Sequence, residues 1–132
     1  MTTPRWKPIA LAALATLCLG ATAARAEGDP AAGKLVFRKC AACHTVDAGK
    51  NRVGPSLAGI VGRPAGTVEG FKYSDPMKAF GAGGGVWDEA TLDAYLADPK
   101  GFIKGNKMVF LGLKLAQERA DVIAYLKTAT GG

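Results

Sequence analysis

The residues of this chain that could do chemistry are concentrated in the run Cys40-Ala41-Ala42-Cys43-His44. Two cysteines three residues apart, followed at once by a histidine, form the C-x-x-C-H pattern of covalent c-type haem attachment. Each thiol can add across one vinyl group of the porphyrin, and the histidine is then held at the iron as an axial ligand. His44 is the only histidine, so no other imidazole competes for this role. The run therefore predicts one covalently bound haem.

Two other chemistries use a C-x-x-C pair, namely a dithiol redox centre and a zinc site. A structural zinc site takes four thiolate or imidazole ligands, and the whole chain holds only three cysteines and one histidine. A dithiol centre does not require a histidine directly after its second cysteine. We therefore favour haem attachment over both alternatives.

The first 26 residues have the layout of a secretory signal peptide. Arg5 and Lys7 precede an apolar stretch, Ile9–Ala24, and Ala24-Arg25-Ala26 forms a small-x-small cleavage site. The apolar stretch is shorter than the roughly 20 residues that span a bilayer, so a permanent anchor is the less favoured interpretation. We expect cleavage after Ala26 and export to the periplasm, which leaves residues 27–132 as one small domain.

Cleavage also changes the charge and the thiol content of the protein. The signal peptide carries three basic residues and no acid, so the formal charge falls from +6 to +3. Cys18 leaves with it, and only the two cysteines of the haem motif remain. This net positive charge is too small to indicate nucleic-acid binding. With only two cysteines left, both in the haem motif, no disulfide framework is expected.

Three helices are expected in the mature chain. The first begins at Asp29-Pro30, a capping carboxylate followed by proline, and leads to Cys40. The second begins at Trp87-Asp88 and stops at Asp98-Pro99, because a residue before proline is pushed out of helical geometry. The third places Leu115, Val122, Ile123 and Leu126 on one stripe. Residues 45–85 are rich in glycine and proline and are expected to be loops wrapped around a ligand. This pattern predicts an all-α fold.

The second axial ligand can come from either of two methionines. Met77 and Met108 are the methionines left after the signal peptide is removed. A thioether ligand raises the reduction potential, which suits an electron carrier. Met108 lies between two glycines in a segment that could loop over the ring. The spacing favours Met108 and leaves Met77 as the alternative.

Further short segments that carry a family resemblance are spread along nearly all of residues 27–132. They are Gly28-Asp29-Pro30-Ala31-Ala32-Gly33, Val53-Gly54-Pro55, Gly62-Arg63, Gly70-Phe71-Lys72-Tyr73-Ser74-Asp75, Trp87, Tyr95-Leu96, Lys107-Met108-Val109-Phe110 and Ala120-Asp121-Val122-Ile123-Ala124-Tyr125-Leu126. Through these segments the chain resembles the class I c-type cytochromes, most closely the bacterial cytochrome c2 and mitochondrial cytochrome c branch.

The resemblance implies a small cytochrome c fold, with three main helices and loops around the haem, and a role for each site residue. Met108 would be the sixth iron ligand, opposite His44. The carbonyl of Pro55 would accept the ring N–H of His44, and Tyr95 would donate to the Met108 sulfur. The remaining residues would line the haem, with Phe110 beside its exposed edge and three around its propionates: Arg63, Tyr73 and Trp87. Gly33 and Tyr125 would meet where the first and last helices cross.

Three positions depart from the family pattern. Met77 stands where asparagine is usual near the haem, Asn106 where threonine is common, and Lys104 where proline is common. None of these departures changes the expected iron ligands.

A His/Met iron has no vacant position, so the expected function is one-electron transfer between ferric and ferrous states, not enzymatic turnover. The resemblance suggests a quinol-oxidising cytochrome bc complex as donor and a photosynthetic reaction centre or terminal oxidase as acceptor. We expect a soluble, monomeric carrier that docks on these membrane complexes through a basic face: Lys39, Lys50, Lys100, Lys104, Lys107 and Lys114. The main alternative is a haem enzyme or gas sensor with an open upper position.

Overall fold

The computed structural model describes residue 2 and residues 26–129, and helices are the only regular elements in this part of the chain. They are α1 (Pro30–Val36), the 3₁₀ turn η1 (Phe37–Lys39), α2 (Asp75–Ala82), α3 (Glu89–Ala97), α4 (Pro99–Phe102) and α5 (Ala116–Thr128). One isolated β-bridge joins Pro64 and Val86. The all-α prediction is therefore confirmed. The predicted signal peptide, residues 1–26, lies almost wholly outside the described residues.

Short polar side chains just before α1 and α3 set where these helices begin. The Asp29 carboxylate accepts from the Ala31 N–H before α1, and the Asp88 carboxylate accepts from the Thr91 N–H before α3. Each bond satisfies one of the N–H groups that a first helical turn leaves without a partner. Helix α3 ends at Ala97, directly before Asp98-Pro99. These boundaries agree with the sequence prediction.

Three details of the prediction were wrong. Helix α2 lies inside the region expected to be loop, where Ser74 caps it and a proline occupies its first turn. Helix α4 interrupts the segment expected to be a plain connection, since Pro99 both ends α3 and starts α4. Leu115 does not join the buried stripe of α5. It precedes the helix in extended geometry and is 65% exposed.

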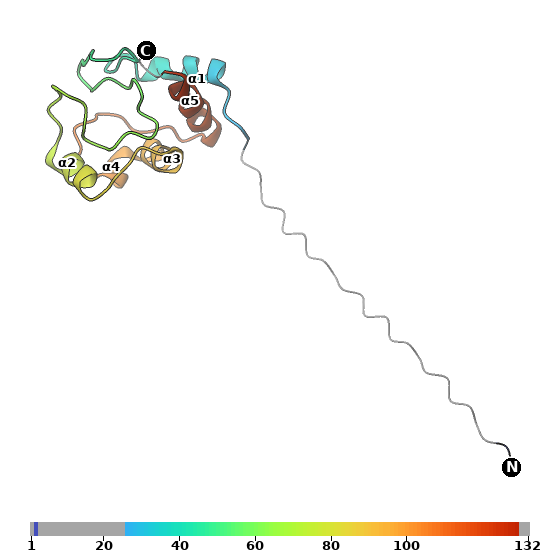
Figure 1. Cartoon of the computed structure of the whole chain (residues 1–132). Coiled ribbons are helices and arrows are strands. Elements are labelled where there is room, and N and C mark those ends of the chain that lie inside the picture. The colour runs from blue at the N-terminus through green and yellow to red at the C-terminus, as the bar shows by residue number, and fades with distance from the viewer. Residues whose placement is uncertain (1, 3–25, 130–132) are drawn as a thin grey trace.

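The first and last helices cross at close range (Figure 1). A Cβ atom built on Gly33 of α1 would lie 1.9 Å from the backbone oxygen of Asp121 in α5, so only glycine fits there. The Asp121 carboxylate accepts from the Asp29 N–H at 2.8 Å, and the rings of Phe37 and Tyr125 pack 5.4 Å apart. This crossing ties the segment before the haem motif to the C-terminal helix.

Aromatic side chains join the other helices. Phe80 of α2 packs on Trp87 at 5.5 Å and on Phe102 of α4 at 5.7 Å, and Trp87 packs on Tyr95 of α3 at 4.8 Å. In Figure 1 these helices lie along one side of the molecule, α1 and α5 lie along another, and the loop drawn in green closes the third. The helices and the loop surround a central cavity. None of the described helices has the length and apolar character needed to cross a membrane.

We expect Gly33→Ala to destabilise the protein by about 1–3 kcal/mol, because the new methyl group must push α1 away from α5. The measurement is denaturant unfolding of the haem-loaded protein. Gly83→Ala is the matched control, since its Cβ would make ordinary contacts at 3.4 and 3.6 Å. Equal stability of the two variants would contradict the close crossing.

Candidate functional site

A cavity of about 260 Å³ brings the sequence-predicted site residues together. Cys40, Cys43, His44 and Met108 line it although they come from both ends of the described chain. The other predicted residues line the same cavity: Pro55, Arg63, Tyr73, Trp87, Tyr95 and Phe110. Exposed Val53 and Val109 also contribute to the lining, so the cavity reaches the surface there.

The haem motif follows η1 as a short series of turns. The Cys43 and His44 N–H groups donate to the Cys40 carbonyl at 3.0 and 2.9 Å. Two outside contacts clamp this segment, because Arg52 donates to the Ala41 carbonyl and Gly54 N–H donates to the Cys43 carbonyl, both at 2.8 Å. Burial raises the pKa of the Cys40 thiol, while the charge of Lys39 acts in the opposite sense. The motif is therefore held in place by its own turns and by the contacts from Arg52 and Gly54.

His44 presents one defined ring nitrogen to the cavity. Its Nδ1 lies 2.7 Å from the carbonyl oxygen of Pro55, which can only accept, so Nδ1 carries the proton. Burial lowers the pKa of the ring, which keeps it neutral and leaves the Nε2 lone pair free to bind a metal. Gly54 makes room for the ring, because a Cβ there would lie 2.3 Å from His44 Cε1.

The sulfur of Met108 has a hydroxyl donor beside it. Tyr95 Oη lies 3.9 Å from Met108 Sδ and donates to it. Burial raises the pKa of Tyr95 to about 12, so its hydroxyl keeps its proton at neutral pH. Met77, the alternative sulfur, also lines the cavity. The hydroxyl donor of Tyr95 bonds to Met108, and this contact distinguishes Met108 from Met77.

A polar group of residues lines another part of the cavity. The Arg63 guanidinium donates to the carbonyls of Ala58 at 2.9 Å and Ser56 at 3.1 Å. Burial lowers the pKa of Arg63, and nearby Tyr73 acts against this. Tyr73 Oη accepts from the Val68 N–H at 3.1 Å. This part of the lining suits carboxylate groups, because it offers a fixed positive charge.

The sequence analysis missed several residues that shape the site. Gly54 and Arg52, described above, could have been suspected only from their place beside the haem motif. Asn106 is buried and lines the cavity, although the sequence marked it only as a departure from the family. The rest of the missed lining is mostly apolar: Leu57, Ile60, Phe71, Leu92, Leu96 and Leu126. No periodicity could have assigned them to a cavity instead of a solid core.

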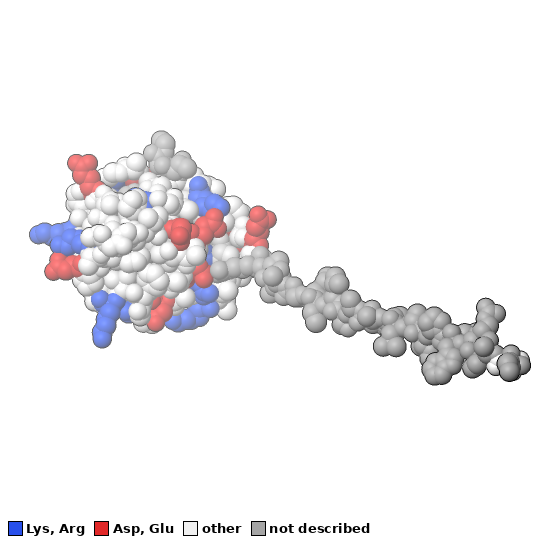
Figure 2. Space-filling view, turned by 60° about the horizontal axis from the view of Figure 1, so that its bottom comes forward, with Lys and Arg blue, Asp and Glu red and all other residues white. Residues whose placement is uncertain are grey.

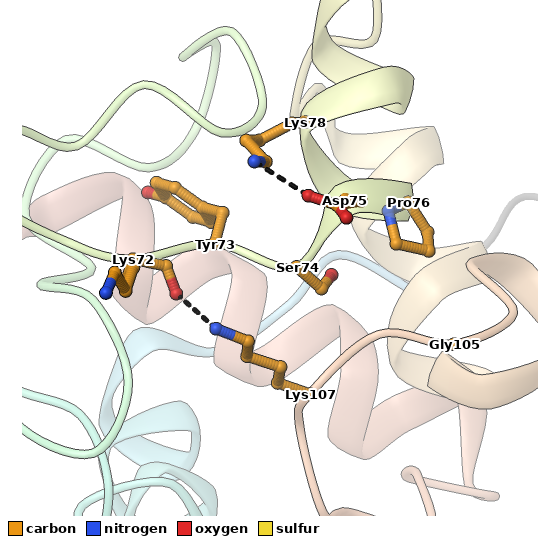
Figure 3. A pocket seen from close by; sticks show the side chains of 8 residues that line it. All are labelled: Lys72, Tyr73, Ser74, Asp75, Pro76, Lys78, Gly105 and Lys107. Atoms are coloured by element: carbon orange, nitrogen blue, oxygen red, sulfur yellow. Dashed lines mark hydrogen bonds and ion pairs between the residues drawn. The ribbon is translucent and has the colours of Figure 1, made fainter.

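A second hollow, of about 490 Å³, lies at the surface beside Lys107 (Figure 3). It is lined by Lys72, Tyr73, Ser74, Asp75, Pro76, Lys78, Gly105 and Lys107. Lys107 Nζ donates to the Lys72 carbonyl at 2.8 Å, and Lys78 pairs with Asp75 at 2.7 Å. Lys72 and Lys78 were absent from the predicted basic face.

The residues of the central cavity fit the haem that the sequence predicts. Two half-buried free thiols, an imidazole with a fixed tautomer and a thioether line one mainly apolar space. A porphyrin requires these features: two thiols for its vinyl groups, two axial donors and apolar walls. Within the described residues, no cluster of three or more histidine, cysteine, aspartate or glutamate side chains could hold a bare metal ion.

Comparisons with known proteins agree with this geometry. The family model described as "Cytochrome c" matches residues 30–130. The chain is 63% identical over 92 residues to cytochrome c2 iso-2 of Magnetospirillum fulvum, covering 70% of this chain and 93% of that protein. It is 48% identical over 126 residues to cytochrome c2 of Rhodomicrobium vannielii, covering 95% and 98%. The solved structure of cytochrome c2 from Rhodospirillum centenum superposes with a TM-score of 0.73 at 46% identity, covering 76% and 98%.

Proposed function

This chain belongs to the cytochrome c family, and from that premise we propose that it is a mobile one-electron carrier of the periplasm with His44 and Met108 as its iron ligands. Membership makes it an electron-transfer protein, not an enzyme, and its cofactor is haem c bound covalently through the C-x-x-C-H motif. When bound, the haem supplies an iron that changes reversibly between ferric and ferrous states.

One observation carries the assignment of the ligands. His44 and Met108 line the same cavity, and each has its own hydrogen-bonding partner, Pro55 for the ring and Tyr95 for the sulfur. Contacts of this kind orient a ligand before the metal binds and tune its donor strength. If His44 and Met108 both bind the iron, no axial position is left for oxygen or peroxide. This favours an electron carrier over a haem enzyme or gas sensor.

The other site residues have roles that follow from their contacts. Cys40 and Cys43 would form the thioether bonds, and Arg63, Tyr73 and Trp87 would face the propionates, where the guanidinium charge offsets that of the carboxylates. Phe110 would lie beside the haem edge. Phe110 is partly buried and lines the cavity next to Val109, which is 96% exposed, so this wall of the cavity is the one closest to a partner.

We place the carrier in the periplasm, with residues 1–26 as a signal peptide cleaved after Ala26 and residues 27–132 as the mature domain. The basic start, apolar stretch and small-x-small site support this, and N-terminal sequencing of the exported protein tests it. A quinol-oxidising cytochrome bc complex would be the donor, and a reaction centre or terminal oxidase the acceptor.

The predicted basic face divides into two kinds of lysine. Lys39 pairs with Glu118 at 2.7 Å and Lys50 with Asp47 at 3.0 Å, so their charges are partly neutralised. Lys100, Lys107 and Lys114 instead donate to backbone carbonyls, which leaves their positive charge in place. Together with Lys104 they flank the segment that carries Met108. We propose these four as the centre of the docking face, presented by a monomer.

The surface charge on the side of α2 to α4 is mixed. Figure 2 turns this side toward the viewer and shows basic side chains separated by acidic ones and by wide uncharged areas. The steering field on acidic partners is therefore expected to be modest, in line with the small net charge after cleavage.

Replacing Met108 tests the ligand assignment. We expect Met108→Ala to open an iron position that binds carbon monoxide in the ferrous state, whereas the unchanged protein does not bind it. Met77→Leu is the matched control and should behave like the unchanged protein. The measurement is the visible spectrum with and without carbon monoxide. Carbon monoxide binding by Met77→Leu and not by Met108→Ala would assign the sulfur to Met77 and contradict the proposal.

Ionic strength tests the docking face. The rate of electron transfer to isolated membrane complexes should fall as salt rises, because exposed opposite charges are screened over about 10 Å at 0.1 M. Lys104→Gln should lower the low-salt rate several-fold. Lys127→Gln removes the same charge elsewhere, from a residue paired with Glu89, and should have a smaller effect. Equal losses in both variants, or a flat salt profile, would contradict the face.

A further inference from the structure

We propose that Asn106 is a positioning residue that fixes the backbone of Met108 and so holds its sulfur at the iron, an inference that rests on the proposed function. Asn106 is only 4% exposed, which is rare for an asparagine and requires its amide to be fully bonded. It lies two residues before the proposed ligand and lines the same cavity.

All of the polar groups of Asn106 have partners. Its side-chain Nδ2 donates to the carbonyls of Pro99 at 2.7 Å and Ile103 at 2.9 Å. Its Oδ1 accepts from the Met108 N–H at 2.8 Å. Its own backbone N–H donates to Ile103 at 3.1 Å, and its carbonyl accepts from the Lys100 ammonium group. One side chain therefore joins both ends of α4 directly to the backbone of Met108.

This junction matters because only one of the first three side chains after Met108, that of Phe110, packs against the core. Val109 is 96% exposed and Leu111 is 89% exposed, so burial of their side chains does not restrain the chain beyond Met108. A second restraint lies just before Met108, where Lys107 donates to the Lys72 carbonyl (Figure 3). That bond is exposed, whereas the Asn106 bonds to the α4 carbonyls are buried and contribute more.

The carboxamide is suited to this position for a geometric reason. It offers two donors and one acceptor in one plane, and the site uses all three. Threonine, the residue common here in the family, has a single hydroxyl proton and can satisfy only one of the two carbonyls. Aspartate keeps the acceptor for Met108 but turns a carboxylate oxygen toward the carbonyls of Pro99 and Ile103.

Imidazole competition measures how firmly the sulfur is held. Imidazole can bind ferric iron only after Met108 leaves, so its apparent affinity reports the fraction of molecules with the sulfur detached. In Asn106→Ala we expect this affinity to rise about tenfold or more, because several buried hydrogen bonds are lost. The reduction potential should fall as the sulfur ligand weakens.

Asn51 provides the matched control. It is the other asparagine of the chain, and its amide also bonds backbone groups, donating to Glu69 at 3.0 Å and accepting from Ser56 at 2.9 Å. Asn51→Ala removes two side-chain bonds from a different loop and should change the imidazole affinity less than twofold. Equal increases in both variants would mean that general loosening is responsible and would overturn the proposal.

Two further measurements decide the question if Asn106→Ala fails to fold. Asn106→Thr and Asn106→Asp should each raise the imidazole affinity above that of the unchanged protein, with aspartate retaining the bond to Met108. In the unchanged haem-loaded protein, the Met108 amide should exchange with solvent at least about tenfold more slowly than the Leu111 amide. Equal exchange rates, or threonine and aspartate variants indistinguishable from the unchanged protein, would overturn the proposal.

A different result of the imidazole experiment would show that the proposed function itself is wrong. If the unchanged protein binds imidazole as tightly as a haem with an open position, Met108 is not a ligand and the proposed function is wrong. If the unchanged protein resists imidazole and Asn106→Ala resists it equally, the ligand assignment stands and the role of Asn106 is wrong.

Discussion

His44 donates its Nδ1 proton to the carbonyl oxygen of Pro55 at 2.7 Å, and this bond determines which ring nitrogen faces the cavity. The orientation of the ring in turn depends on the loop that carries Pro55. Gly54 must lack a side chain for the ring to fit, and its N–H must reach back to the Cys43 carbonyl. The haem motif and this loop therefore position each other, and the ring that we propose as an iron ligand is oriented before any metal is bound.

The methionine that we propose as the second iron ligand is held in a different way. Met108 lies on an irregular segment between α4 and α5, with exposed residues after it and a buried asparagine before it. Its sulfur accepts from Tyr95 of α3, and its backbone N–H is bonded by Asn106. The histidine side thus depends on a loop clamped against the motif, whereas the methionine side depends on the Tyr95 side chain of α3 and on the Asn106 side chain, which is bonded to the backbone of Pro99 and Ile103. We expect the methionine side to be the weaker of the two.

Much of this arrangement could be predicted from the sequence because it depends on residues that are close together along the chain. Several features each depend on only a few neighbouring residues. They are the haem motif, the capping residues Asp29 and Asp88, and the end of α3 at Asp98-Pro99. Helices α2 and α4 were missed because they are short and rich in glycine and proline, which usually indicate turns. The role of Asn106 was missed because it depends on carbonyls brought near by α4. The pairing of Lys39 with Glu118 depends on the crossing of α1 and α5, which no local pattern reveals.

Proton NMR of the reduced, haem-loaded protein identifies the sulfur ligand, because the ring current of the porphyrin moves the methyl resonance of an iron-bound methionine far upfield. We predict one such methyl signal, which is lost in Met108→Ala and kept in Met77→Leu. A shifted methyl group assigned to Met77, or two methionine methyl groups at ordinary positions, would contradict it.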